Sequence, residues 1–165
     1  MSTPLDTAWK IHAAQVDWTG KVDSKASFAF TISSAALATT VALSADGRTF
    51  SRLSERWEQL AFWSGIALAL AGALFALIVV VPRLRHRNVE SEAPTNYIYF
   101  GHLRLWTAEM LVEELTKGDP MPVVARQSVI MAAIAWRKHL WVQRAMACTG
   151  GGIGLLVITG LSANL

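Results

Sequence analysis

A short basic and aromatic segment, WRKHLWVQR, covers residues 136–144 and holds the side chains best suited to binding an anionic ligand. Arg137, Lys138 and His139 carry N–H donors, which form strong charge-assisted hydrogen bonds with phosphate oxygens. Two tryptophans interleave with them, and indole faces stack on nucleobases. We therefore predict a phosphate- or nucleotide-binding surface here. The alternative interpretation is structural, since basic and aromatic side chains beside an apolar helix anchor it at a membrane surface.

A second group of residues lies upstream and extends the predicted ligand-binding set. Arg126 precedes Arg137 by about three helical turns, so the two can belong to one helix. Tyr97, Tyr99 and His102 come earlier in the chain, and we expect Arg126 to face the same space as these three side chains. The set therefore contains four upstream residues in addition to the basic segment.

No arrangement of residues in the sequence points to catalysis. There is no HExxH, phosphate-loop or GxSxG motif, and the four histidines are scattered. The GGGIG run at 150–154 lies within an apolar stretch that continues a helical pattern, so it is not a dinucleotide-binding loop. Cys148 is the only cysteine and cannot form an intramolecular disulfide. We expect no enzyme, no cofactor and no metal site.

Membrane helices must position these residues, because apolar residues make up 53% of the chain and charged residues only 16%. The clearest span is 61–82, a charge-free stretch that ends at a proline and is long enough to cross about 30 Å of hydrocarbon. Residues 26–45 are a second, hydroxyl-rich candidate, and residues 145–165 are a third, glycine-rich one. We predict an all-α membrane protein with about three transmembrane helices.

The distribution of lysine and arginine predicts the orientation in the membrane. Twelve of the fifteen basic residues fall in residues 1–25 and 83–144, and the other three fall in the loop 46–60. Cytoplasmic segments of membrane proteins carry the excess of basic residues. We therefore expect a multi-pass protein of the inner membrane, with its N-terminus and its basic middle domain in the cytoplasm and the loop 46–60 outside.

Both cytoplasmic segments are predicted to form helices that continue into the membrane. Residues 1–25 read as an amphipathic helix that runs into the first span, with a weak point at Gly20. The competing interpretation is a helix lying flat on the membrane surface. Two of the three spans would then extend into the cytoplasm.

The middle domain, 83–144, is predicted to be small and mostly helical. Residues 97–100, YIYF, have a strand-like composition. Thr107 suits the N-cap of a helix over 108–117, and a further helix starts near Pro122 and continues into the third span. Some sixty residues are too few to bury a large core, so we expect this domain to pack against the N-terminal helix and against neighbouring subunits.

Small and hydroxyl side chains within the spans predict close helix association. Gly150 and Gly154 form a small-xxx-small pair, which lets helix backbones approach. Ser27, Thr31 and Ser34 fall near one face of the first span. Two interpretations stay open, packing between helices and the lining of a water-filled path in an oligomer. The spans hold no Asp, Glu, Lys or Arg, which argues against a proton relay, a voltage sensor or a pump.

Three parts of the chain carry a family resemblance: VDSKASFAFTISSAALA at 22–38, VPRLRHR with NYIYFGHLR at 81–87 and 96–104, and ARQSVIMAAIAWRKHLWVQ at 125–143. In this order they resemble the Pycsar effector transmembrane family of bacterial antiphage defence. The most specific matches are the D-x-K-A pattern and the IYFGHL segment, which include Asp23, Lys25, Ala26, Tyr99, Phe100, Gly101 and His102.

The resemblance implies a membrane effector without enzymatic activity. In such systems a partner nucleotidyl cyclase or related nucleotidyltransferase makes a nucleotide signal, and the effector impairs the membrane, so that the infected cell stops growing or dies. We accordingly predict a homo-oligomeric pore or membrane-disrupting protein in the lipid bilayer, gated by a cyclic nucleotide or an oligonucleotide. The alternative is a non-gated membrane anchor or scaffold that recruits a protein partner.

Overall fold

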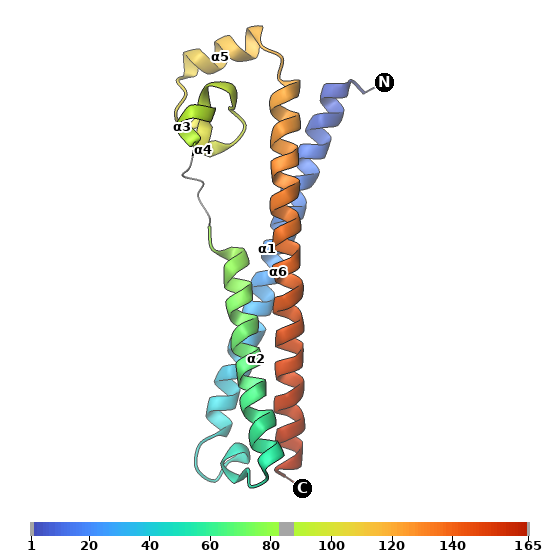
Figure 1. The fold of residues 1–165 in the computed structure, drawn as a ribbon, viewed down its shortest axis with the longest axis vertical. Coiled ribbons are helices and arrows are strands. Elements are labelled where there is room, and N and C mark those ends of the chain that lie inside the picture. Colours follow the sequence, from blue (N-terminus) through green and yellow to red (C-terminus); the bar gives the residue numbers. More distant parts are fainter. Residues whose placement is uncertain (1, 83–87, 165) are drawn as a thin grey trace. The chain divides into compact units, whose positions relative to one another are not determined.

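The computed structural model of the protein describes residues 2–82 and 88–164, and these residues are mostly helical (Figure 1). The elements are α1 (Pro4–Leu43), η1 (Thr49–Arg52), α2 (Arg56–Val80), α3 (Val89–Glu92), η2 (Ala93–Thr95), α4 (Phe100–Leu103), α5 (Ala108–Lys117) and α6 (Met121–Ser162). Among them α1, α2 and α6 are long and apolar enough to cross a membrane. The predicted all-α fold with three candidate spans is confirmed.

The chain forms two compact units. The first unit combines residues 1–20 with 82–136, and the second combines residues 21–81 with 137–165. Helices α1 and α6 each contribute residues to both units, and Gly20, the predicted weak point, lies inside an unbroken α1. Three basic residues that contributed to the predicted orientation lie outside the described residues: Arg83, Arg85 and Arg87.

The second unit is a bundle in which α2 lies alongside the later part of α1 and of α6 (Figure 1). Ala29, Ala76 and Ala145, one from each helix, form a buried cluster, with Phe30 and Phe75 packed against it. Small side chains at such contacts let the helix backbones approach closely. Close packing is the main source of helix association in lipid, where apolar burial gives little driving force.

Glycine is required where α2 meets α6. A Cβ on Gly152 would lie 2.7 Å from the backbone nitrogen of Ala69 and 2.8 Å from the carbonyl oxygen of Gly65. Gly150 and Gly154, the predicted packing pair, have nothing within 4 Å of the Cβ position. Within one chain the close approach therefore depends on Gly152 and not on the predicted pair, whose side of α6 is open.

A buried hydroxyl pair ties α1 to α6 in the same bundle. The Oγ of Ser33 and the Oγ1 of Thr149 are 2.7 Å apart, and Thr149 also donates to the carbonyl oxygen of Ala145 at 2.8 Å. Gly72 of α2 lies against this pair, since a Cβ there would be 2.5 Å from the Thr149 Oγ1. Hydrogen bonds between helices in a membrane contribute on the order of 0.6 kcal/mol each.

A buried carboxylate fixes the start of α2. The Oε2 of Glu58 accepts a hydrogen bond from the backbone N–H of Glu55 at 3.3 Å, and its Oε1 accepts one from the hydroxyl of Ser162 at 2.7 Å. Because of this N-terminal capping, α2 begins at Arg56, so the end of the predicted loop 46–60 is helical. At its other end α2 stops at Val80, just before the proline that was predicted to end it.

The first unit contains the short helices of the middle domain. The Oγ1 of Thr107 accepts a hydrogen bond from the backbone N–H of Met110, so α5 covers Ala108–Lys117, as predicted. Helix α6 begins at Met121, one residue before Pro122, and runs without a break to Ser162. The predicted continuation of this helix into the third span is therefore confirmed.

The strand-like segment 97–100 does not form a strand. The carbonyl oxygen of Tyr99 accepts hydrogen bonds from the backbone N–H groups of His102 and Leu103, which starts α4 at Phe100. Strand propensity largely reflects packing against neighbouring strands, and the described residues contain none. The Tyr97 ring packs on Trp106 instead, and the Tyr99 ring packs on His102.

Candidate ligand-binding site

An ion pair between α1 and α6 is the centre of the candidate site. The Nζ of Lys138 lies 2.6 Å from one carboxylate oxygen of Asp23 and 2.8 Å from the other. The side chains of Lys138 and Asp23 are 25% and 39% exposed, so the pair is partly shielded from water. Lys138, from the predicted ligand surface, therefore pairs with Asp23, from the family pattern, although 115 positions separate them in the sequence.

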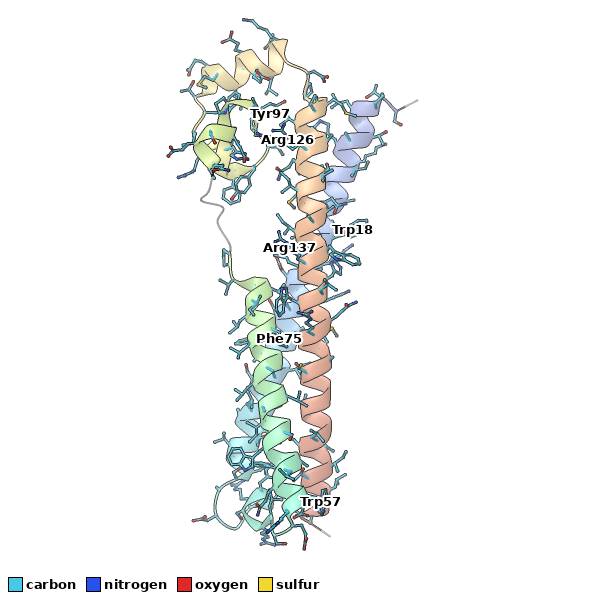
Figure 2. The ribbon with its side chains drawn as sticks, in the orientation of Figure 1. Trp18, Trp57, Phe75, Tyr97, Arg126 and Arg137 are labelled. Carbon is cyan, nitrogen blue, oxygen red and sulfur yellow. The ribbon has the colours of Figure 1, made fainter. Side chains whose placement is uncertain are left out.

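Rigid packing holds the backbones that carry this ion pair. A buried cluster beside it draws on all three helices of the second unit and consists of Val22, Ala26, Val79 and Val142. Trp141 packs against the cluster, and its ring centroid lies 5.4 Å from that of Phe75 on α2, which is labelled in Figure 2. Ala26, which belongs to the family pattern, therefore has a packing role, whereas its neighbour Lys25 is exposed.

The basic residues of segment 136–144 point in different directions from α6. Arg137, Trp141 and Arg144 are spaced i, i+4, i+7 and so share one face. The guanidinium carbon of Arg144 lies 4.8 Å from the Trp141 ring centroid, which is a cation–π contact, and Arg137 is exposed (Figure 2). Successive helical residues are turned by about 100°, so Lys138 points to α1 and His139 lies on a third face.

Tyr97 belongs to the first unit and is a core residue there. It is buried, and its ring centroid lies 5.7 Å from that of Trp106. Burial raises the pKa of the Tyr97 phenol, and the negative charges of Glu114 and Asp119 raise this pKa further. Surroundings that are both apolar and acidic disfavour a phosphate group at this residue.

Tyr99 and His102 lie together in the first unit. Their ring centroids are 5.2 Å apart in an edge-on arrangement, and the Nε2 of the buried His102 lies 3.7 Å from a carboxylate oxygen of Glu92. A Cβ on Gly101 would collide with the Tyr99 ring, so a larger residue there would displace this ring. Phe100, the remaining member of that pattern, is exposed.

The seven predicted ligand-binding residues are divided between the two units. Tyr97, Tyr99, His102 and Arg126 belong to the first unit, and Arg137, Lys138 and His139 belong to the second. Figure 2 labels the exposed side chain of Arg126 on α6. The described contacts join Tyr99 to His102 within the first unit and Lys138 to Asp23 within the second.

The predicted hydroxyl face of the first span is exposed at Ser27, Thr31 and Ser34. The Ser27 hydroxyl donates to the carbonyl oxygen of Asp23, and the Thr31 hydroxyl donates to that of Ser27, both at 3.0 Å. Hydroxyl groups that are satisfied by their own helix can face either lipid, a neighbouring helix or water. Both interpretations of this face, packing and pore lining, therefore stay open.

The pairing of Asp23 with Lys138 is the part of the site that sequence reasoning missed. The one available signal is position, since Asp23 lies three residues before the predicted first span and Lys138 seven residues before the predicted third. Opposite charges at the same end of two neighbouring membrane helices can pair. Nothing local to either residue reveals which partner it takes.

The family comparison covers nearly the whole chain. The family described as the Pycsar effector protein domain matches residues 7–164, a range that includes the Asp23–Lys138 pair, all of α2 and α6, and all but the first three residues of α1. No curated protein and no solved structure matches the chain. With its three apolar helices, the chain belongs to the Pycsar effector domain family and is a membrane effector of antiphage defence.

Proposed function

We propose that copies of this chain assemble in the inner membrane as a pore or membrane-disrupting oligomer that responds to a nucleotide and has no enzymatic activity. Family membership supports this proposal, because a signalling nucleotide and a partner cyclase are general features of the family. The ligand is a cyclic nucleotide or an oligonucleotide. Its binding impairs the membrane of an infected cell, which arrests growth or kills the cell.

The observation that carries the proposal is the ion pair between Asp23 and Lys138. A nucleotide phosphate competes with the Asp23 carboxylate for the Lys138 ammonium, because both anions form charge-assisted hydrogen bonds with it. Arg137 and Arg144, on the adjacent face of α6, supply further donors to the phosphate. Phosphate binding therefore removes this link between α1 and α6 beside the start of their apolar parts, and the change continues along the two unbroken helices.

The energy of this release is modest for each chain. A partly exposed ion pair contributes about 1 kcal/mol or less, so its loss shifts a two-state equilibrium by roughly fivefold. In an oligomer several such pairs respond together, and their effects multiply if the copies switch as one. A ligand acts in this way only because it binds one state better than the other.

Two single substitutions and one exchange of charges test the proposal. Asp23→Asn and Lys138→Gln each break the ion pair, so both should move basal flux from liposomes toward the level that nucleotide produces in the original chain. Asp23→Lys combined with Lys138→Asp keeps an ion pair between the same helices. This exchanged variant should show the basal flux of the original chain but no response, because the phosphate now meets a carboxylate on α6.

The measurement is dye or ion flux from liposomes that hold the purified protein, with and without cyclic mononucleotides and short oligonucleotides. The direction of the change need not be assumed. Each single variant should shift the basal flux in the same direction as nucleotide shifts it, whether nucleotide opens or closes the pore. If both single variants keep the basal flux and the full nucleotide response of the original chain, the ion pair is not the switch.

A further inference from the structure

Helix α5 carries an apolar stripe that the first unit leaves uncovered. Ala108, Val112 and Leu115 recur at i, i+4, i+7 and therefore share one face of the helix. Val112 is 64% exposed and Leu115 is 55% exposed, and no residue of α5 is buried. This spacing is typical of a helix that packs its apolar seam on a second helix.

Helix α6 carries a second stripe with the same spacing within the first unit. Ala125, Val129, Ala132 and Trp136 recur at i, i+4, i+7, i+11, and all four are exposed. Val129 is 72% exposed and Trp136 is 69% exposed. The stripe alternates small and large side chains, which leaves hollows of the kind that Val and Leu side chains of another helix fill.

The charges beside the two stripes are opposite in sign. Helix α5 carries three glutamates and one lysine, a net charge of −2, and the exposed Glu109 lies beside its stripe, about 60° from Val112. Glu113 lies about 100° from Val112 and pairs with Lys117 of the same helix at 2.8 Å. The part of α6 in the first unit, 121–136, has no acidic residue, and the exposed Arg126 lies beside its stripe. Complementary charges at the rim of a contact favour one partner and one register.

We propose that the α5 stripe of one copy packs on the α6 stripe of a second copy. Val112 and Leu115 fill the hollows beside the alanines of α6, and Glu109 meets Arg126. Each copy offers both surfaces, so the contact is heterologous and joins successive copies head to tail. The inference rests on the proposed function for the existence of the oligomer and names the surfaces through which its copies meet.

A membrane surface suits the α5 stripe less well than a second copy does. Amphipathic helices that lie on membranes carry mainly Lys and Arg on their polar face, because cytoplasmic lipid headgroups are anionic. The net charge of α5 is negative, so such a surface repels it. The acidic polar face of α5 instead complements the basic residues of α6.

Cross-linking between two differently tagged copies tests the contact. In a Cys148→Ser background, one copy carries Val112→Cys and the coexpressed copy carries Val129→Cys. We expect a disulfide-linked pair that contains both tags, and only when both variants are present. Met110→Cys is the matched control, since it lies about 160° around α5 from Val112 and is also exposed, and it should give no mixed pair.

Reversal of the rim charges gives a second, independent readout. Arg126→Glu should weaken association by about fivefold, and so should Glu109→Lys. The two changes together should restore association, because they exchange the signs across the contact. Association is measured by the yield of the mixed cross-link and by the oligomer distribution of the purified protein.

The outcomes separate this interface from the proposed function. Oligomers that persist without a Val112–Val129 cross-link, or that cross-link equally well through Met110, would overturn the interface. The interface would also be overturned if added liposomes shield the α5 stripe from solvent while no mixed cross-link forms. The membrane surface would then be the partner of α5. Nucleotide-dependent flux without the cross-link would leave the proposed function standing, and the cross-link without such flux would support the interface alone.

Discussion

Gly152→Leu should break the packing of α2 on α6, whereas Gly150→Leu, two residues away on the same helix, should leave the bundle folded. At Gly152 the first side-chain carbon would already lie 2.7 Å from a backbone nitrogen and 2.8 Å from a carbonyl oxygen. These atoms belong to the backbone of α2 and cannot move aside without displacing the helix. Overpacking of a core typically costs 1–3 kcal/mol, and we expect about 3 kcal/mol here.

The matched control works because the Cβ position of Gly150 faces open space. For a chain of this length a loss of about 3 kcal/mol corresponds to a fall in Tm of roughly 10 °C. Thermal unfolding of both variants in detergent, followed by circular dichroism, gives the comparison. Equal melting temperatures for the two variants would show that α2 and α6 do not meet at Gly152.

Replacing Arg137 and Lys138 together with alanine should abolish the response to nucleotide. The two substitutions remove two phosphate donors, and the loss of Lys138 also breaks its ion pair with Asp23. Flux from liposomes should therefore be the same with and without nucleotide, a ratio of about 1, at a level near that of the ligand-bound state. Membrane insertion should be retained, because neither residue lies within a predicted span.

Lys117→Ala is the control for the loss of positive charge. Lys117 is an exposed lysine of α5 whose ion pair with Glu113 contributes only a few tenths of a kcal/mol. This variant should keep the full nucleotide response. A double variant at Arg137 and Lys138 that inserts normally and still responds would remove the basic segment from the ligand site.

The parts of the fold that sequence predicts well are those with local causes. A charge-free stretch of sufficient length predicts α2, and the hydroxyl of Thr107 predicts the start of α5, because each signal lies in the residues that form the helix. The unbroken course of α6 follows from a helical pattern without a breaking residue between Pro122 and Gly150. Such signals need no knowledge of the tertiary structure.

The parts that sequence does not predict depend on contacts between distant residues. The choice of Gly152 over Gly150 as the packing glycine depends on the rotation of α6 against α2, which a run of three glycines leaves undecided. The pairing of Asp23 with Lys138 depends on the register of α1 and α6. Tyr97 belongs to the ligand-binding set that the sequence predicts, but its packing on Trp106 makes it part of a core.

The most direct test of a nucleotide-responsive membrane effector is flux from liposomes that hold the purified, unaltered chain. Dye or ion flux is recorded without nucleotide, with cyclic mononucleotides and with short oligonucleotides, and insertion is confirmed separately. We predict that at least one of these nucleotides switches the flux on or off. Inserted protein that gives no flux under any of these conditions would contradict the account and favour a non-gated membrane anchor.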